Sequence, residues 1–225
     1  MKTVKLLRGL LPALLLLPLA QVWPADMPPG TIGATPDTLT VNPSAVLLAS
    51  VSGTLNSGTF TASYIENVYR DPTNQFGAND LDFVIQLTDN GAVNGSGGAS
   101  GIIEHMTSSS FTGFLTDIGI NLTGAPGLAA SGTSIPNTVD HSVNGDVVTW
   151  DFTGSGNNTL NGGNTTVLLE VQTNTMSFGP GSIGAIDGAG AFANGYAPVV
   201  PEPGSMALFG LGTIAMFVYR RARRA

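Results

Sequence analysis

Between residues 44 and 198 the hydrophobic residues come in short runs that alternate with polar ones, which is the pattern of half-buried β-strands. Around Phe83, Ile85 and Leu87, every second residue is large and apolar. The runs are rich in Val, Ile, Thr and Phe, and Gly, Asn, Asp and Ser fill the gaps between them, as strands and turns require. We therefore expect strands over residues 46–55, 59–68, 81–88, 102–107, 111–121, 147–152, 165–173 and 176–186.

This succession of strands, with no convincing helical periodicity, predicts an all-β fold, either an antiparallel β-sandwich or a jelly roll. We place this domain at residues 44–198 and treat the proline-rich residues 21–43 as an extended lead-in. Trp150 shares its side of the alternation with Val148 and Phe152, so it is expected in the core. A sugar-stacking platform formed by Trp150 with tyrosines 64, 69 and 196 is the alternative.

The N-terminus has the organisation of a secretory signal. Lys2, Lys5 and Arg8 precede an apolar stretch over residues 9–20 that is too short to cross a membrane comfortably. We predict a signal peptide over residues 1–20, with cleavage after Ala20. Signal peptidase and the secretion machinery are its expected partners.

The C-terminus combines three features in a fixed order. Pro201-Glu202-Pro203 is followed by sixteen uncharged residues, 204–219, and then by a basic cluster. As a helix those sixteen residues measure about 24 Å, slightly less than the roughly 30 Å of a bilayer core. We predict a single transmembrane helix. The basic cluster after it should stay in the cytoplasm, which places the body of the protein on the other side of the membrane. The cluster that stops the helix consists of Arg220, Arg221, Arg223 and Arg224.

These residues resemble the tripartite PEP-CTERM sorting signal, which here would occupy residues 199–225. The resemblance implies that exosortase, a membrane protease of the transpeptidase type, processes the chain at Pro201, Glu202 and Pro203. It also implies an inner-membrane intermediate, then release to the cell surface or medium, often together with exopolysaccharide. Runs such as Val68-Tyr69 and Asp71-Pro72 resemble the β-rich bodies of such proteins, which have no assigned activity.

The charge distribution excludes one class of partner. Of the fifteen acidic residues, fourteen lie between residues 21 and 200, where Arg70 is the one basic residue. An anionic body without clustered Lys and Arg does not bind nucleic acid. We expect Arg70 to pair with Asp71 or another nearby carboxylate. The chain has no cysteine, so disulfides and thiolate metal sites are excluded.

A calcium site is the one metal hypothesis that the sequence offers. Asp71, Asp80 and Asp82 place three carboxylates within twelve residues, and calcium prefers oxygen ligands. The spacing is not that of an EF-hand, and Asp also favours turns by bonding its own backbone. Turn chemistry is the main interpretation, with calcium as the alternative and no other cofactor expected.

The residues do not assemble a known catalytic motif. Glu104-His105 and Asp140-His141 allow a Ser–His–Asp triad to be drawn, but the Gly95-Ser96-Gly97 run lacks the setting of a nucleophile elbow. We expect no enzyme, but a structural or adhesive protein of the cell surface or extracellular matrix, linked to exopolysaccharide. The alternatives are an extracellular carbohydrate-active hydrolase and a permanently anchored single-pass protein.

Overall fold

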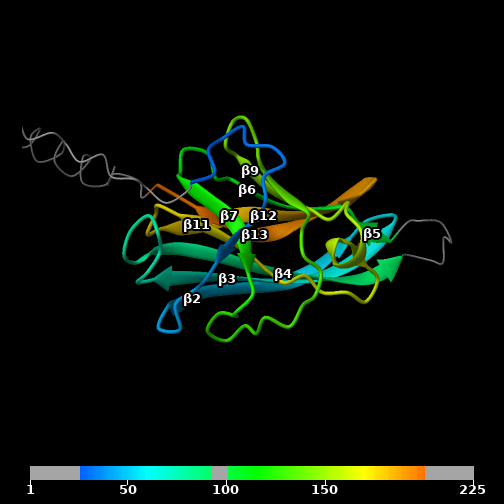
Figure 1. The fold of residues 1–225 in the computed structure, drawn as a ribbon, viewed down its shortest axis with the longest axis horizontal. Helices are drawn as coiled ribbons and strands as arrows, with labels where there is room; N and C mark the ends of the chain where they lie inside the picture. The colour runs from blue at the N-terminus through cyan, green and yellow to red at the C-terminus, as the bar shows by residue number, and fades with distance from the viewer. Residues whose placement is uncertain (1–25, 93–100, 201–225) are drawn as a thin grey trace, which may run out of the picture.

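Two β-sheets face each other in the computed structural model, which describes residues 26–92 and 101–200 (Figure 1). The larger sheet has six strands in the order β1-β7-β11-β4-β3-β2, and the smaller has five in the order β13-β12-β6-β9-β8. A short two-stranded ribbon, β10-β5, lies beside them. The strands are β1 (Asp37–Leu39), β2 (Val46–Asn56), β3 (Phe60–Asp71), β4 (Asp80–Ala92), β5 (Ile102–Ile103), β6 (His105–Ser109), β7 (Thr116–Asn121), β8 (Thr138–His141), β9 (Val147–Asp151), β10 (Leu160–Asn161), β11 (Leu168–Thr173), β12 (Phe178–Asp187) and β13 (Ala189–Pro198).

Period-two alternation builds the core between the sheets. In the larger sheet the register aligns Val68, Phe83, Val171 and Ile118 across four strands, and all four are fully buried. The smaller sheet contributes Trp150, whose Nε1 donates a 3.0 Å hydrogen bond to the carbonyl of Gly119 on the opposite sheet. The prediction that Trp150 lies in the core is confirmed, as is the all-β class.

The strand boundaries differ from the predicted ones mainly at turns and at Gly-rich segments. The strand expected over residues 111–121 begins only at Thr116, because Phe111 is buried in a turn closed by the 3.2 Å bond from Phe114 N to Phe111 O. Phe111 there packs edge-on against Phe83. Strands β1, β8, β10 and β13 were not expected from the sequence.

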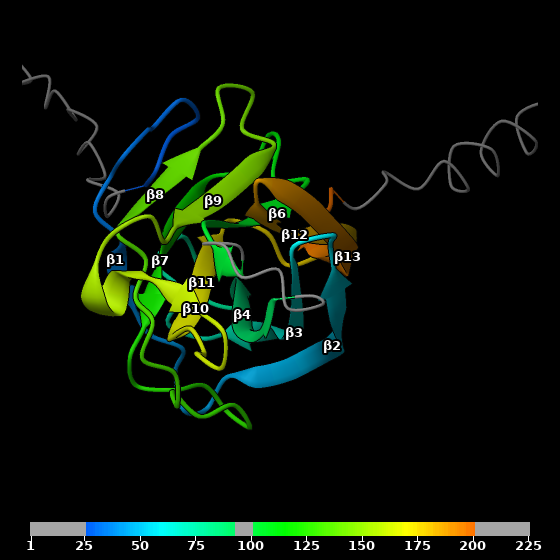
Figure 2. The same ribbon diagram turned by 90° about the vertical axis from the view of Figure 1, so that its right-hand side faces the viewer.

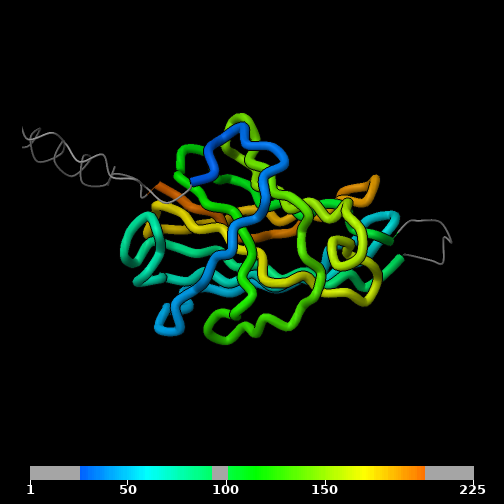
Figure 3. Tube along the Cα trace, in the orientation of Figure 1, coloured from blue at the N-terminus to red at the C-terminus, as the bar shows by residue number. Residues whose placement is uncertain are grey.

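The segment expected as an extended lead-in contributes to the sandwich. Within it, β1 pairs in parallel with β7, the one parallel pair among the named strands that the structure describes. Figure 3 shows this blue segment running down the outside of the molecule. Gly119 makes the close approach possible, since a Cβ there would lie 2.2 Å from the carbonyl oxygen of Asp37.

Strands β13 and β2 are the edge strands on the same side of the sandwich (Figure 2). β13 ends at Pro198, and the backbone N–H of Val199 still donates a 3.0 Å hydrogen bond to Ser177. The predicted signal peptide and transmembrane helix lie outside the described residues. Within those residues, there is no helix with the length and apolar character needed to cross a bilayer.

Candidate functional site: a buried carboxylate row and the groove beside it

A row of polar side chains crosses the outer face of the larger sheet. The register of β3, β4, β11 and β7 places Tyr69, Asp82, Gln172 and Asp117 side by side. Neighbouring residues of a strand point to opposite faces. The strands that send Val68 and Phe83 into the core therefore send Tyr69 and Asp82 outward.

These outward carboxylates are nonetheless shielded from water. Asp82 and Glu170 are 0% exposed and Asp117 is 2% exposed. The cover comes from the loops around residues 40–45 and 122–130, which form a small second apolar cluster with the sheet. That cluster includes Val41, Ala45, Tyr69, Val84 and Leu168.

Asp71 at the end of β3 fastens the covering loop around residues 40–45 and the loop that follows β3 itself. Its Oδ2 accepts a 2.6 Å hydrogen bond from the backbone N–H of Asn42. Its Oδ1 accepts from the backbone N–H and the hydroxyl of Thr73, at 2.6 and 2.8 Å. Arg70, the preceding residue, is exposed, and the Asp71 carboxylate bonds to these loops in place of the expected pairing with Arg70.

Asp82 lies beside Asp71 and differs from it in its bonding. Oδ1 of Asp82 accepts a 2.6 Å hydrogen bond from Asn74, whereas Oδ2 is buried without a partner. Burial raises the pKa of Asp82 well above its usual range, and the charges of Glu170 and Asp71 raise it further. Burial and these neighbouring charges therefore favour the protonated, neutral form of Asp82 in the folded protein.

The row continues with two more acids whose proton affinity is increased. Burial raises the pKa of Glu170 to about 7, although hydrogen bonds from Asn121 and Gln172 oppose the shift. Burial likewise raises the pKa of Asp117 to about 7, while a 2.7 Å bond from Gln75 lowers it and nearby Asp37 raises it. Below about pH 7, Glu170 and Asp117 are therefore mostly protonated in the folded protein.

The three residues predicted as calcium ligands meet only in part. Asp71 and Asp82 are neighbours, and Asp80 is the register partner of Asp71 on β4. The Asp80 carboxylate turns toward the loop at Gly77, where an added Cβ would lie 2.7 Å from its Oδ2. Among the described residues, no three acidic or histidine side chains are arranged to hold a metal ion. Calcium binding therefore stays a hypothesis, and Oδ2 of Asp82 has no hydrogen-bond partner among the described residues.

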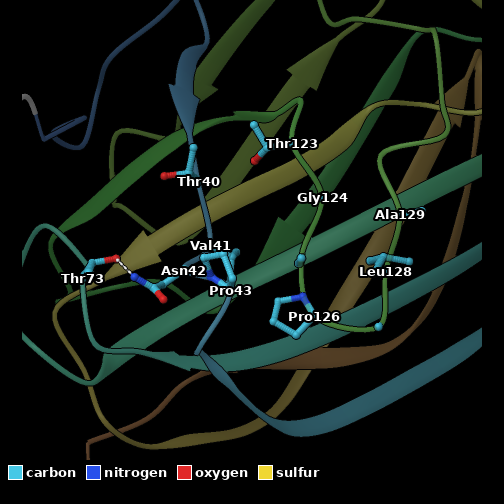
Figure 4. Close-up of a pocket in the computed structure, with 12 residues that line it drawn as sticks. Thr40, Val41, Asn42, Pro43, Thr73, Thr123, Gly124, Pro126, Leu128 and Ala129 are labelled. Atoms are coloured by element: carbon cyan, nitrogen blue, oxygen red, sulfur yellow. Dashed lines mark hydrogen bonds between the residues drawn. The ribbon is translucent and has the colours of Figure 1, made fainter.

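A groove of about 810 Å³ lies beside the row, between the two loops that Asp71 fastens and the loop after β7. Its walls are neutral, with hydroxyl and amide groups at Thr40, Asn42, Thr73 and Thr123 and apolar surface from Pro126 onward (Figure 4). Asn42 donates a 3.4 Å hydrogen bond to Thr73 within this wall. The lining residues include no carboxylate, so this groove does not provide the acid pair that a glycoside hydrolase needs.

The histidines suggested for a catalytic triad lie apart from this groove. His141 is buried, with Nδ1 2.7 Å from the Met27 carbonyl and Nε2 3.1 Å from the Gly145 carbonyl. Its ring therefore joins the N-terminal segment to the β8–β9 hairpin. Asp140 and the Glu104-His105 pair belong to the smaller sheet and its edge, on the other side of the core.

The core face of the larger sheet holds a further buried acid that the sequence analysis did not single out. Glu66 of β3 is 0% exposed and faces the core, where its Oε2 accepts a 2.7 Å hydrogen bond from the backbone N–H of Tyr196 on β13. Tyr64 donates a 2.7 Å bond to the carbonyl of Asn194 on the same strand. Burial raises the pKa of Glu66 to about 8, although the bond from Tyr196 opposes the shift. The alternation of β3 could have revealed Glu66, because it has the parity of the buried residues Tyr64 and Val68.

Comparison with known proteins adds one assignment. Residues 199–224 match the PEP-CTERM protein-sorting motif, and they begin directly after the last residue of β13. The match includes Pro201-Glu202-Pro203 and the arginine cluster that follows the apolar stretch. No curated protein and no solved structure matches the chain. The chain therefore carries the signal of proteins that are exported, held in the membrane as an intermediate and processed by exosortase.

Proposed function

We propose that this protein is a non-enzymatic structural or adhesive component of the cell surface or extracellular matrix, associated with exopolysaccharide. The observation that carries the proposal is the sorting motif at residues 199–224. Proteins with this signal are delivered outside the cell. A domain delivered in this way acts where it meets surface polymers rather than cytoplasmic substrates.

The sorting motif begins where the folded domain ends, so the motif can be cleaved from the domain. The last strand, β13, ends at Pro198, and Val199 makes the last backbone hydrogen bond of the sandwich. Cleavage within residues 201–203 would remove none of the described strand pairing. The β-sandwich would then leave the membrane as a finished domain.

The character of the sandwich supports a structural or binding role. The larger-sheet acids Asp71, Asp82 and Glu170 are buried and accept hydrogen bonds within the protein, and the neighbouring groove is lined by neutral side chains. Neutral hydroxyl and amide groups exchange hydrogen bonds with hydrated polymers at little desolvation cost, whereas charged groups are costly to desolvate. Such a surface favours association with sugars over chemistry performed on them.

The test compares the location of the protein in cells with and without exosortase. We expect it in the matrix or medium when exosortase is present and in the inner membrane when it is absent. Glu202→Ala should produce the same retention, whereas Asp26→Ala, at an exposed acid of the body, should not. Equal release from both strains would contradict the proposal, and extraction of the matrix polysaccharide should release the processed protein with it.

A further inference from the structure

Phe192 is the most exposed aromatic side chain that the structure describes, at 68% of its surface. It lies on β13, on the outer face of the smaller sheet, and its register partner on β12 is Gly184. A Cβ at Gly184 would lie 2.7 Å from Cε1 of the ring, and a Cβ at Gly190 would lie 3.1 Å from Cε2. The ring therefore rests on the sheet over two positions that have no side chain, with its other side in solvent.

Small hydroxyl-bearing residues surround this ring on the same face. The register continues the row from Phe192 and Gly184 to Thr107 on β6 and Thr149 on β9. In the adjacent row, Ser182 of β12 is paired with Ser109 of β6. Each of these hydroxyl residues is partly exposed. Neighbouring strands lie about 4.8 Å apart, so the face presents a regular array of small hydrogen-bonding groups beside one aromatic plane.

The charges near this face select against anionic polymers. Asp140 is the register partner of Thr149, and Asp151 is paired with His105 in a neighbouring row. Arg70, the one basic residue of the described chain, belongs to the larger sheet. A polyanion would meet carboxylates here without a compensating cation, whereas a neutral polymer would meet hydroxyls and an apolar ring.

The other aromatic residues considered for sugar stacking are not accessible in this way. Trp150 and Tyr69 are 0% exposed, and Tyr64 is 6% exposed. The ring of Tyr196 packs edge-on against Phe178, with centroids 5.3 Å apart. Phe192 is thus the aromatic residue whose open face can receive a ligand.

We propose that the outer face of the five-stranded sheet around Phe192 is a binding platform for a neutral polysaccharide, which stacks a sugar ring on Phe192 and hydrogen-bonds to the flanking threonines and serines. This inference deepens the proposed function and rests on it, since it names the surface and the class of polymer. An aromatic ring above a cross-strand glycine also stabilises a sheet. Binding and stability must therefore be measured separately.

The experiment uses the processed protein purified from the medium. Its retention is measured on microcrystalline cellulose and cross-linked dextran, which are neutral, and on an alginate gel, which is anionic. We expect binding to at least one neutral polymer and none to alginate. Phe192→Ala should lower the association constant at least tenfold, Phe192→Trp should retain it, and Val46→Ala, at an exposed residue of β2, should leave it unchanged.

Thermal unfolding of each variant separates binding from folding. If Phe192→Ala unfolds below the assay temperature, the binding assay uses Thr107→Val and Thr149→Val instead. These variants remove a hydroxyl while preserving the shape of the side chain, and each should weaken binding. Three results would overturn the proposed platform. They are equal binding by the wild type and the folded variants, binding to alginate alone, and no binding to either neutral polymer. A dimer that Phe192→Ala dissociates would also overturn it, because the ring would then be a protein interface. If the Phe192→Ala protein is still retained in the matrix of the cells that express it, the platform is rejected while the proposed function stands.

Discussion

The carboxyl group of Glu66 on β3 accepts a 2.7 Å hydrogen bond from the backbone N–H of Tyr196 on β13, across the gap between the two sheets. Tyr196 belongs to an edge strand, so an N–H on the outer side of that strand has no neighbouring strand to which it can donate. The bond thus occupies a backbone donor that would otherwise point away from the smaller sheet. A glutamate in the core is costly unless it is neutral or well bonded, and here it joins the sheets at one corner.

Glu66 predicts a pH dependence of folding. The folded pKa of about 8 exceeds the ordinary 4.5, so between these values the unfolded chain releases a proton that the folded chain keeps. The free energy of unfolding should therefore fall as pH rises from about 5 to 8, by up to about 1.4 kcal/mol per pH unit from this group. Urea titrations at each pH measure the slope, and Glu66→Gln should reduce it.

Glu170 and Asp117, with pKa values raised to about 7, act in the same direction. The Glu66→Gln protein should therefore keep a smaller slope below pH 7, and Glu170→Gln should reduce that remainder. A free energy of unfolding that rises between pH 5 and 8 would contradict the assignment of buried neutral acids.

Asp71 and Asp82 should respond differently to the same substitution. Asp71 accepts three hydrogen bonds from Asn42 and Thr73, and bonds to a charged group are worth about 1.5–3 kcal/mol each. Asp71→Asn should lower stability by about 3 kcal/mol or more, since an amide cannot accept at both positions. Asp82→Asn should change stability little, because burial already favours a neutral group there and the amide oxygen can still accept the hydrogen bond from Asn74.

Calcium provides the matching ligand test of this pair. If Asp82 is protonated in the folded protein, the melting temperature in millimolar calcium should equal that in EDTA. A rise with calcium that Asp82→Asn abolishes would favour a cation between Asp71 and Asp82 over a protonated Asp82.

Gly119 predicts a steric effect at the edge of the larger sheet. A Cβ there would lie 2.2 Å from the backbone oxygen of Asp37, so Gly119→Ala should displace β1 and cost about 2 kcal/mol or more. Gly58→Ala is the matched control, since nothing lies within 4 Å of a Cβ at Gly58 and its φ is not positive. Equal stability of the two variants would show that β1 is dispensable to the sandwich.

The position of β13 indicates how far the chain can be shortened from its C-terminus before the fold is lost. A chain ending at Val200 should melt within about 2 °C of the full chain in detergent, because every described strand remains. A chain ending at Gly188 loses β13 with the buried Ala191 and Ala197 and should not fold cooperatively. Far-ultraviolet circular dichroism during heating measures both, and cooperative unfolding of the shorter chain would contradict the role of β13.

Local pattern was sufficient to predict most of the fold. In β4 the alternation of Phe83, Ile85 and Leu87 identifies the strand and its core face, whereas the burial of Asp82 and Val84 on the other face follows only from the loops that cover them. β13 contains mostly Ala, Gly and Asn, and only its pairing with β12 makes it a strand. β1 has three residues and depends on the space above Gly119.

The candidate site was predictable only where it is local. Asp71 and Asp82 are close in sequence and were singled out together, whereas Asp117 and Glu170 come from strands far along the chain and join the row through register. Phe192 was not singled out, because its exposure depends on glycines of two paired strands. The sorting signal, by contrast, is contiguous and was identified from its residues alone.

The central claim is that the tail is a removable sorting signal, and the intact mass of the exported protein tests it most directly. In cells with exosortase, the mature C-terminus should lie at or before the Pro201–Pro203 segment, and in cells without it the membrane-bound protein should extend to Ala225. Recovery of exported protein that still contains Phe217 and Arg220 from exosortase-competent cells would contradict the account.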